Sequence, residues 1–311
     1  MSTSPFARQP YEGILTFAGR PHSRELKDVD VAIVGVPYDG ATSNRSGARF
    51  GPRAIREQSS LLWGYNNAQQ IAPFEILNVV DYGDVPVIPV DVVSTHRSIE
   101  QTATTVLNQG TRLISLGGDH SIALPLLRAH ARKHGPLAVI HVDAHPDTWD
   151  VEFGDIKYSH GTPFRRAIEE GLIDTSAYLQ IGIRGPTTGP QDYADAIGLG
   201  ARLITCDEAI ERGMADVVSE IRNRVGTRSC YLSFDIDAVD PAFAPGTGTP
   251  EVGGFTSHQV LQLLRGLTGL NVVGADLVEV APPWDSGQIT SLLASNLVFE
   301  ILSLMARRRL E

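Results

Sequence analysis

Acidic and imidazole side chains recur directly after three short apolar runs of the chain. The first segment reads Gly-Gly-Asp-His-Ser over 117–121, the second His-Val-Asp-Ala-His-Pro-Asp over 141–147, and the third Asp-Ile-Asp over 235–237. Alternate residues of an extended strand share a face, so Asp143 can lie beside His145, and Asp235 beside Asp237. Because carboxylates gathered without cations repel one another, this pattern predicts a metal site.

The balance of charge favours two divalent ions at this site. The two ions would neutralise four aspartates: Asp143, Asp147, Asp235 and Asp237. Two of these carboxylates must then bridge, which holds the ions about 3.5–4 Å apart, as in two-metal hydrolytic sites. Oxygen ligands with one imidazole per ion favour Mn²⁺ over Zn²⁺. Such a pair lowers the pKa of a bridging water and supplies hydroxide near neutral pH.

Three neighbouring residues have less specific patterns. His141 lies on the same expected face as Asp143, one step deeper in the sheet, so the spacing leaves it open as a further ligand. Asp119 is expected to cap the following helix or to orient His120. Asp240 precedes a proline and is expected to form a turn.

Strands and helices must alternate to bring these segments together. Strands are expected at 29–36, 76–81, 112–116, 137–143, 178–183, 202–205, 229–237 and 272–279, and helices at 52–62, 92–109, 120–134, 163–170, 208–224, 257–267 and 289–307. Several strand runs are apolar almost throughout, which is typical of parallel sheets buried on both faces. The sequence therefore predicts an α/β fold, a three-layer α/β/α sandwich with a mostly parallel, roughly eight-stranded sheet. Ligands of such sheets bind beyond the carboxyl ends of the strands.

Composition narrows the class of protein. The 311 residues are expected to form one domain over 29–311, preceded by an arm over 1–28 that lies on the surface or on a neighbouring subunit. A net charge of −10 without a basic run argues against nucleic acid as a partner. No apolar stretch approaches the ~20 residues that cross a bilayer, and no secretion signal is recognisable. Two cysteines make no disulfide framework, and we expect a cytoplasmic protein.

The three motifs together resemble the signatures of the ureohydrolase (arginase/agmatinase) family. These are Gly-Gly-Asp-His at 117–120, Asp-Ala-His-x-Asp at 143–147 and Ser-Phe-Asp-Ile-Asp-x-x-Asp-Pro at 233–241. Further similar segments lie at 47–53, 160–164, 241–250 and 278–282, so the resemblance extends from about residue 31 to the last expected helix. It implies the arginase-like sandwich and a homo-oligomer, usually a trimer or hexamer.

The resemblance also implies a ligand set for two Mn²⁺ ions per subunit, with Ni²⁺ as the alternative metal. One ion would be held by His120, Asp143, Asp147 and Asp235, and the other by Asp143, His145, Asp235 and Asp237. Asp143 and Asp235 would be the bridging ligands. His141 is set aside on this comparison, because arginases carry tryptophan at its position.

Catalytic roles follow from the same resemblance. Glu279 would bind the guanidinium group of the substrate through charge-assisted hydrogen bonds. The metal-bridging hydroxide would attack the guanidinium carbon, with Asp147 accepting a hydrogen bond from it. His160 would carry a proton to the leaving amine, so that urea is released.

The substrate is expected to be a small linear guanidino compound, with agmatine favoured. Arginases carry asparagine two positions beyond the last aspartate of the second motif, where this chain has Trp149, which argues against arginine. Asp150, Glu152 or Asp155 would suit the amine of agmatine. Arg45 or Lys157 would suit the carboxylate of a guanidino acid.

Several alternatives stay open from the sequence. They are a hydrolase of 4-guanidinobutyrate or 3-guanidinopropionate, of a small or N-alkylated guanidine against the wall of Trp149, or of formiminoglutamate. A non-catalytic partner subunit is a further alternative, although such a subunit should have lost metal ligands and none of the six is missing.

Overall fold

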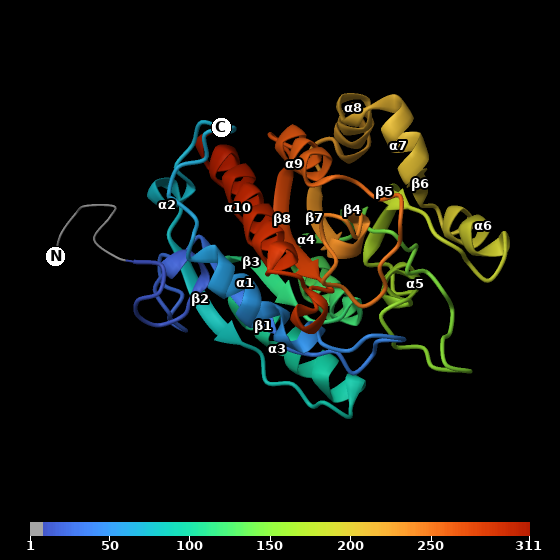
Figure 1. Ribbon diagram of the computed structural model, residues 1–311, viewed down its shortest axis with the longest axis horizontal. Helices are drawn as coiled ribbons and strands as arrows, with labels where there is room; N and C mark the ends of the chain where they lie inside the picture. Colours follow the sequence, from blue (N-terminus) through green and yellow to red (C-terminus); the bar gives the residue numbers. More distant parts are fainter. Residues whose placement is uncertain (1–8) are drawn as a thin grey trace.

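The computed structural model describes residues 9–311 and shows eight strands in one parallel sheet (Figure 1). The strands are Val31–Val36 (β1), Val79–Asp84 (β2), Arg112–Gly117 (β3), Leu137–Val142 (β4), Ile173–Ile183 (β5), Arg202–Thr205 (β6), Ser229–Asp235 (β7) and Asn271–Val278 (β8). Their spatial order is β2-β1-β3-β8-β7-β4-β5-β6, and all seven pairings are parallel. The predicted parallel sheet is confirmed.

Alternate residues of the central strands enter two separate apolar cores. In β4, Ala138, Ile140 and Val142 join one core, whereas Leu137 and Val139 join the other. This division follows from the two-residue period of a strand, and it explains why the run is apolar at every one of these positions.

Helices cover both faces of the sheet and complete the three layers. They are Gly51–Ser59 (α1), Pro73–Ile76 (α2), Val92–Asn108 (α3), Ala123–His134 (α4), Pro163–Glu169 (α5), Gln191–Gly198 (α6), Cys206–Arg212 (α7), Met214–Val225 (α8), Ser257–Gly266 (α9) and Ile289–Leu310 (α10). Residues of α1, α7, α8, α9 and α10 line one core. Residues of α3, α4 and α5 line the other, and Figure 1 shows the two helical layers on either side of the strands.

Some element boundaries differ from the expectation. The helix expected over 208–224 is divided into α7 and α8 at Gly213, whose φ of +81° lies in the left-handed region that ends a helix. The strand expected from residue 76 begins at Val79, because Pro73–Ile76 form the short helix α2. The helix α6 was not expected from the sequence.

The final helix corrects the expectation that no apolar stretch approaches a membrane span. By length and composition alone, α10 could cross a membrane, since it has 22 residues and a mean hydropathy of 1.7 over its most apolar 18 residues. Most of that window, 83%, is buried within the protein. A helix that is apolar all round can be the core helix of a folded domain, and α10 lies against α1, α9 and β8.

Part of the expected N-terminal arm lies on the body of the protein. Phe17 is fully buried, and its N–H donates to the carboxylate of Asp81 at 2.8 Å. The next N–H, that of Ala18, donates to the Ser59 hydroxyl at 2.7 Å. Residues 1–8 of the predicted arm lie outside the described part of the chain.

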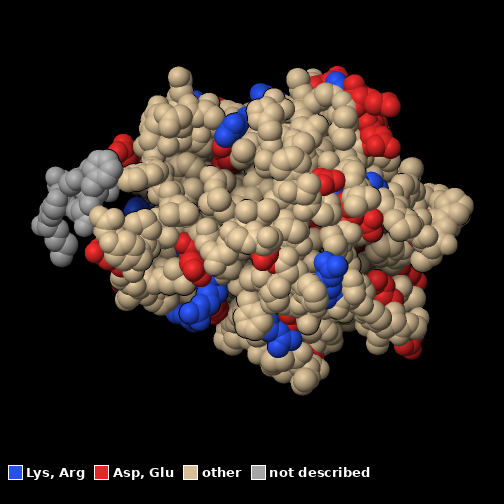
Figure 2. All heavy atoms as spheres, viewed as in Figure 1, with Lys and Arg blue, Asp and Glu red and all other residues tan. Residues whose placement is uncertain are grey.

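Acidic and basic side chains are interspersed on the face drawn in Figure 2, with acidic groups gathered over α7 and α8. Several of these acids are paired, since Arg212 contacts Glu208, Asp216 and Glu220. Both cysteines are buried, and burial raises the pKa of Cys206 to about 11 and of Cys230 to about 12, as expected of structural thiols.

Candidate metal centre

The residues of the candidate site come from four strands that are neighbours in the sheet. β3, β8, β7 and β4 lie side by side, although they are the third, eighth, seventh and fourth strands of the chain. His120 follows β3, Glu279 follows β8, Asp235 ends β7 and Asp143 follows β4. Because the strands are parallel, their carboxyl ends meet at one edge of the sheet, as predicted.

His120 lies at the centre of the first half of this cluster. Its Nδ1 atom is 3.0 Å from carboxylate oxygens of Asp143 and Asp147, and 3.2 Å from one of Asp235. None of these approaches has the geometry of a hydrogen bond, so Nδ1 is a buried nitrogen without a hydrogen-bond partner in the described part of the chain. A lone pair that faces three carboxylates fits a shared cation.

A buried chain of hydrogen bonds sets the tautomer of His120. Its Nε2 lies 2.8 Å from the Ser233 hydroxyl, which donates to Asp276 at 2.6 Å. Tyr231 donates to the other oxygen of Asp276 at 2.7 Å. Since Ser233 gives its proton to Asp276, its oxygen accepts from Nε2–H, and Nδ1 keeps its lone pair for a metal.

His145 lies at the centre of the second half. Its Nδ1 is 3.1 Å from Asp237 Oδ2 and 3.6 Å from Asp143 Oδ1, whereas its Nε2 faces Glu251 at 3.7 Å. Thr249 donates to Asp237 Oδ2 at 3.2 Å. Asp143 thus presents one oxygen to each histidine, which is the arrangement expected of a bridging ligand.

Electrostatics within the cluster favour bound cations. Burial, together with the charge of Asp143, raises the pKa of Asp147 to about 7. Burial and the neighbouring aspartates raise the pKa of Asp235 well above its ordinary value. Carboxylates held in this way are costly to ionise without compensation, and two divalent ions would supply it. The donor set of four aspartates and two histidines therefore fits a binuclear centre.

His141 lies against this cluster with partners for both ring nitrogens. Its Nε2 is 2.7 Å from Asp143 Oδ2, and its Nδ1 faces the Tyr178 hydroxyl at 3.3 Å. Burial lowers the pKa of His141 to about 4, so the ring is neutral. An Nε2–H donated to Asp143 orients that carboxylate, although His120, His141, Asp143 and Asp147 also lie close enough to share an ion.

Glu279 and His160 lie together at the edge of the cluster. Glu279 Oε1 accepts the backbone N–H of His120 at 2.9 Å and lies 3.1 Å from His160 Nδ1. Its Oε2 is buried and has no hydrogen-bond partner among residues 9–311. Although burial opposes a charge on His160, the contact with Glu279 raises its pKa to about 9, with further help from Asp147 and Glu152.

Unusual backbone positions hold this edge in place. Asp147 and Glu279 have φ values of +48° and +62°, in the left-handed region that non-glycine residues rarely adopt. Such conformations are typical of functional sites. Gly118 lies so near to the loop after β1 that a Cβ on this glycine would be 2.0 Å from the Tyr38 carbonyl oxygen.

The residues predicted for the substrate lie in different surroundings. Half-buried Trp149 rests on Gly161, where a Cβ would lie 2.6 Å from the indole, and Glu152 accepts the Gly161 N–H at 3.2 Å. Asp150 is instead exposed and bound to Arg166 of α5 at 2.5 Å. The Arg45 guanidinium lies 4.8 Å from the ring centre of Trp284.

Sequence reasoning missed several partners of the site. An aspartate inside the apolar run of β8, Asp276, was a signal for a buried polar network, and Ser233 is the first residue of the third motif. Ser43, which contacts His160, gave no comparable signal. Asp119 caps the turn at His120 through the Ser121 N–H at 3.0 Å, and Asp240 accepts the N–H of Ala242 at 2.9 Å, so both fulfil the local roles expected of them.

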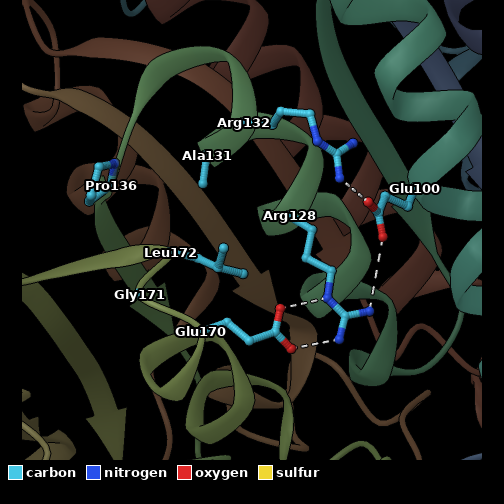
Figure 3. Close-up of a pocket in the computed structure, with 8 residues that line it drawn as sticks. All are labelled: Glu100, Arg128, Ala131, Arg132, Pro136, Glu170, Gly171 and Leu172. Carbon is cyan, nitrogen blue, oxygen red and sulfur yellow. Dashed lines mark hydrogen bonds and ion pairs between the residues drawn. The ribbon is translucent and has the colours of Figure 1, made fainter.

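The pocket in Figure 3 lies apart from these residues. It is lined by Glu100, Arg128, Ala131, Arg132, Pro136, Glu170, Gly171 and Leu172. Its arginines are paired with its glutamates, at 2.6 Å between Arg128 and Glu170. A hollow whose charges are already compensated and that contains no ligand of the cluster is no candidate for the chemistry.

Comparison with known proteins agrees with this geometry. The arginase family matches residues 29–303, nearly the whole chain. The chain belongs to the arginase family. Hydrolases of this family act on guanidino compounds and use a binuclear metal centre, so the chain is an amidinohydrolase whose His/Asp cluster suits metal binding.

Relatives in the arginase family carry different substrate names. A guanidinopropionase of Pseudomonas aeruginosa is 49% identical over 95% of this chain and 93% of its own length. A mitochondrial agmatinase of Gallus gallus is 44% identical over 97% of this chain and 88% of its own. The solved structure of proclavaminate amidino hydrolase from Streptomyces clavuligerus has a TM-score of 0.93 and 45% identity, covering 97% and 100% of the two chains.

Proposed function

We propose that this protein hydrolyses agmatine to urea and an amine, with two Mn²⁺ ions per subunit. The observation that carries the reaction is the unpartnered Oε2 of Glu279, a buried carboxylate oxygen at the edge of the metal cluster. A guanidinium group offers the N–H donors that this oxygen lacks. Gly248 lies next to it, since a Cβ on this glycine would be 3.5 Å from Oε2 and 3.1 Å from the Arg45 carbonyl oxygen.

The proposed ligands are those that the cluster brings together. His120, Asp143, Asp147 and Asp235 would hold one ion, and Asp143, His145, Asp235 and Asp237 the other. The ions, when bound, would lower the pKa of water and supply hydroxide near neutral pH. Ni²⁺ is the alternative, because the same oxygen and imidazole donors accept it.

Glu279 and His160 would act on the two ends of the bond that breaks. Glu279 Oε2 would hold the guanidinium so that its central carbon faces the ligand cluster. As the oxygen of water bonds to that carbon, Asp147 would accept a proton from it, and the bond to the substituted nitrogen would break. His160, which contacts Glu279 through Nδ1, would give a proton to the departing amine. The products are urea and the free amine.

An acidic rim favours a substrate with a cationic tail. Glu152 accepts the N–H of Gly161, the residue after His160, and its negative charge helps to raise the pKa of His160. Glu251 faces His145 on the other side. The Asp150 carboxylate is bound to Arg166, so we leave it out of the proposed amine site. Glu152 is therefore the proposed partner of the agmatine ammonium, and Trp149 an apolar wall.

A guanidino acid is the second candidate. The Arg45 guanidinium is stacked on Trp284 in the loop next to Gly248, where it could receive a carboxylate. The relative named guanidinopropionase supports this alternative, whereas the relative named agmatinase supports the first.

The test is urea release by the Mn²⁺-loaded and Ni²⁺-loaded protein. Agmatine, 4-guanidinobutyrate, 3-guanidinopropionate, arginine, guanidine and N-alkylguanidines form the panel, with formiminoglutamate assayed for formamide. Agmatine should give the highest kcat/KM. A higher value for either guanidino acid would transfer the proposal to that class, and no urea from any compound would overturn it.

A further inference from the structure

Ser43 contacts the ring nitrogen of His160 that does not face Glu279. Its hydroxyl oxygen lies 2.8 Å from His160 Nε2, and its backbone N–H donates to the same atom at 3.1 Å. The opposite nitrogen, Nδ1, faces Glu279. Ser43 is exposed whereas His160 is buried, so the serine stands between the ring and solvent.

The loop that carries Ser43 is fixed to the site from several directions. Asp119 Oδ2 accepts the Ala41 N–H at 2.9 Å, and the Ala41 carbonyl oxygen accepts the His160 N–H at 3.1 Å. Farther along the loop, Asp39 accepts the Gly47 N–H at 2.7 Å. These hydrogen bonds fix the position of the Ser43 backbone relative to His160.

The backbone N–H and the hydroxyl of Ser43 differ in the protonation states of His160 with which they can form a hydrogen bond. A backbone N–H can only donate, so it pairs with His160 Nε2 when that nitrogen has a lone pair. A hydroxyl can donate to the lone pair of the neutral ring, or turn and accept an N–H from the charged ring. With the hydroxyl removed, a protonated Nε2 would face the N–H of residue 43 and would lose the acceptor that now contacts it.

We propose that Ser43 is a positioning residue that enables His160 to hold its second ring proton. The proposal rests on the function above, in which His160 gives a proton to the leaving amine. In the charged state, Nδ1–H donates to Glu279 and Nε2–H donates to the Ser43 hydroxyl. After Nδ1 gives up its proton, the neutral ring keeps Nε2–H, which the Ser43 hydroxyl can still accept.

The carboxylates near His160 also favour the protonated ring. Glu279 is in contact, and Asp147, Glu152 and Asp119 interact with the ring through their charges. These carboxylates favour a charged ring by attraction, yet they do not supply an acceptor at Nε2. The Ser43 hydroxyl differs from these carboxylates because it contacts Nε2 directly and can accept its proton in a hydrogen bond.

The test compares Ser43→Ala with Ser43→Thr, which keeps a hydroxyl. Ser46→Ala is the matched control, because Ser46 lies in the same exposed loop and its carbonyl oxygen makes the contact to Trp284. The first readout is the dependence of kcat on pH, with the best guanidine of the panel and the Mn²⁺ enzyme. In Ser43→Ala, the alkaline limb should move down by about one pH unit, since an acceptor for the charged ring is lost. KM should change less than kcat.

The second readout does not depend on activity. Histidine ¹⁵N NMR of protein loaded with diamagnetic Zn²⁺ follows the His160 ring, identified by its loss in His160→Asn. Ser43→Ala should lower the pKa of His160 by about one unit, while Ser43→Thr and Ser46→Ala should leave it unchanged. An unmoved ring titration in Ser43→Ala, or no recovery in Ser43→Thr, would overturn the proposal.

The two readouts separate failure of this inference from failure of the proposed function. If no guanidine releases urea but the ring titration responds as expected, the assigned reaction is wrong and the effect of Ser43 on His160 stands. If urea is released and neither the pH limb nor the ring titration moves in Ser43→Ala, the reaction stands and the role of Ser43 is wrong.

Discussion

Glu279 and His160 meet at 3.1 Å, between Oε1 and Nδ1, while the other oxygen of Glu279 is buried without a partner. The same Oε1 also accepts the backbone N–H of His120. The Glu279 carboxylate thus contacts the His160 ring and the backbone of His120 through Oε1, and its Oε2 is left for a further hydrogen-bond donor. This relationship makes Glu279 the residue at which binding and proton transfer are coupled in the proposed reaction.

Glu279→Gln should lower kcat/KM for a guanidinium substrate by about 10²-fold or more, because a charge-assisted hydrogen bond is replaced by a neutral one. Metal content should stay at the wild-type level, since Glu279 is not among the proposed ligands. Steady-state kinetics and elemental analysis of the same sample provide the measurement. Unchanged kinetics would remove Glu279 from the substrate site.

Asp235→Ala should lose at least one metal ion per subunit and nearly all activity. Asp235 approaches His120 Nδ1 at 3.2 Å and is one of the two proposed bridging ligands. Metal analysis after dialysis, followed by urea release, tests this role. Two ions per subunit with full turnover would show that the bridging assignment is wrong. Asp240→Asn is a suitable control, because Asp240 holds a turn nearby.

Asp276→Asn should weaken binding of the ion at His120 by about 10–100-fold without removing a ligand. The Ser233 hydroxyl would no longer be committed to a carboxylate, so it could donate to Nε2 and place the His120 proton on Nδ1. Titration of the metal-free protein with Mn²⁺ gives the affinity. Equal affinities in the variant and the wild type would show that the buried network does not set the tautomer.

Glu152→Gln should lower kcat/KM for agmatine by about tenfold and change that for 4-guanidinobutyrate much less, because the proposed contact is with the distal ammonium. Asp150→Asn serves as control, because the Asp150 carboxylate is exposed in the same loop and is bound to Arg166. Arg45→Ala should weaken hydrolysis of the guanidino acid if that class is the substrate. Equal losses for both compounds in Glu152→Gln would argue for a structural role of Glu152.

The stabilisation that Mn²⁺ confers should grow as the pH rises from about 5 to about 8. In the metal-free fold, burial raises the pKa of the proposed ligand Asp147 to about 7 and that of Asp235 well above its ordinary value. An unfolded aspartate titrates near pH 3.9. Between these values the folded protein binds more protons at these groups, so the stability that they contribute is full below pH 3.9 and is lost as the pH rises to about 7.

Metal ions bind the deprotonated carboxylates and reverse that trend. Thermal unfolding with EDTA and with Mn²⁺, at matched ionic strength from pH 5 to pH 8, measures the difference in Tm. A metal-induced shift that is independent of pH would show that protons and metal do not compete in the cluster. Mg²⁺ at the same concentration separates this effect from ionic strength. Size-exclusion chromatography with light scattering on the same samples would test the predicted trimer or hexamer.

Local sequence determined the strands, most helices and the motif residues of the site. Apolar runs such as 137–142 are buried on both faces of a sheet and therefore predict a parallel α/β fold. The spacing within each motif also placed Asp143 beside His145, because a strand alternates with a period of two. These properties depend on near neighbours along the chain, which is why they could be predicted.

The tertiary structure decided which motifs meet and what surrounds them. The order β3-β8-β7-β4 places Glu279, the last motif residue of the chain, between segments that precede it by up to 159 positions, as its contact with His120 shows. Strand order depends on long-range packing, which spacing does not encode. The same holds for Ser43 on His160 and Asp276 behind Ser233, and for α10, whose apolar surface is satisfied by the core of this fold.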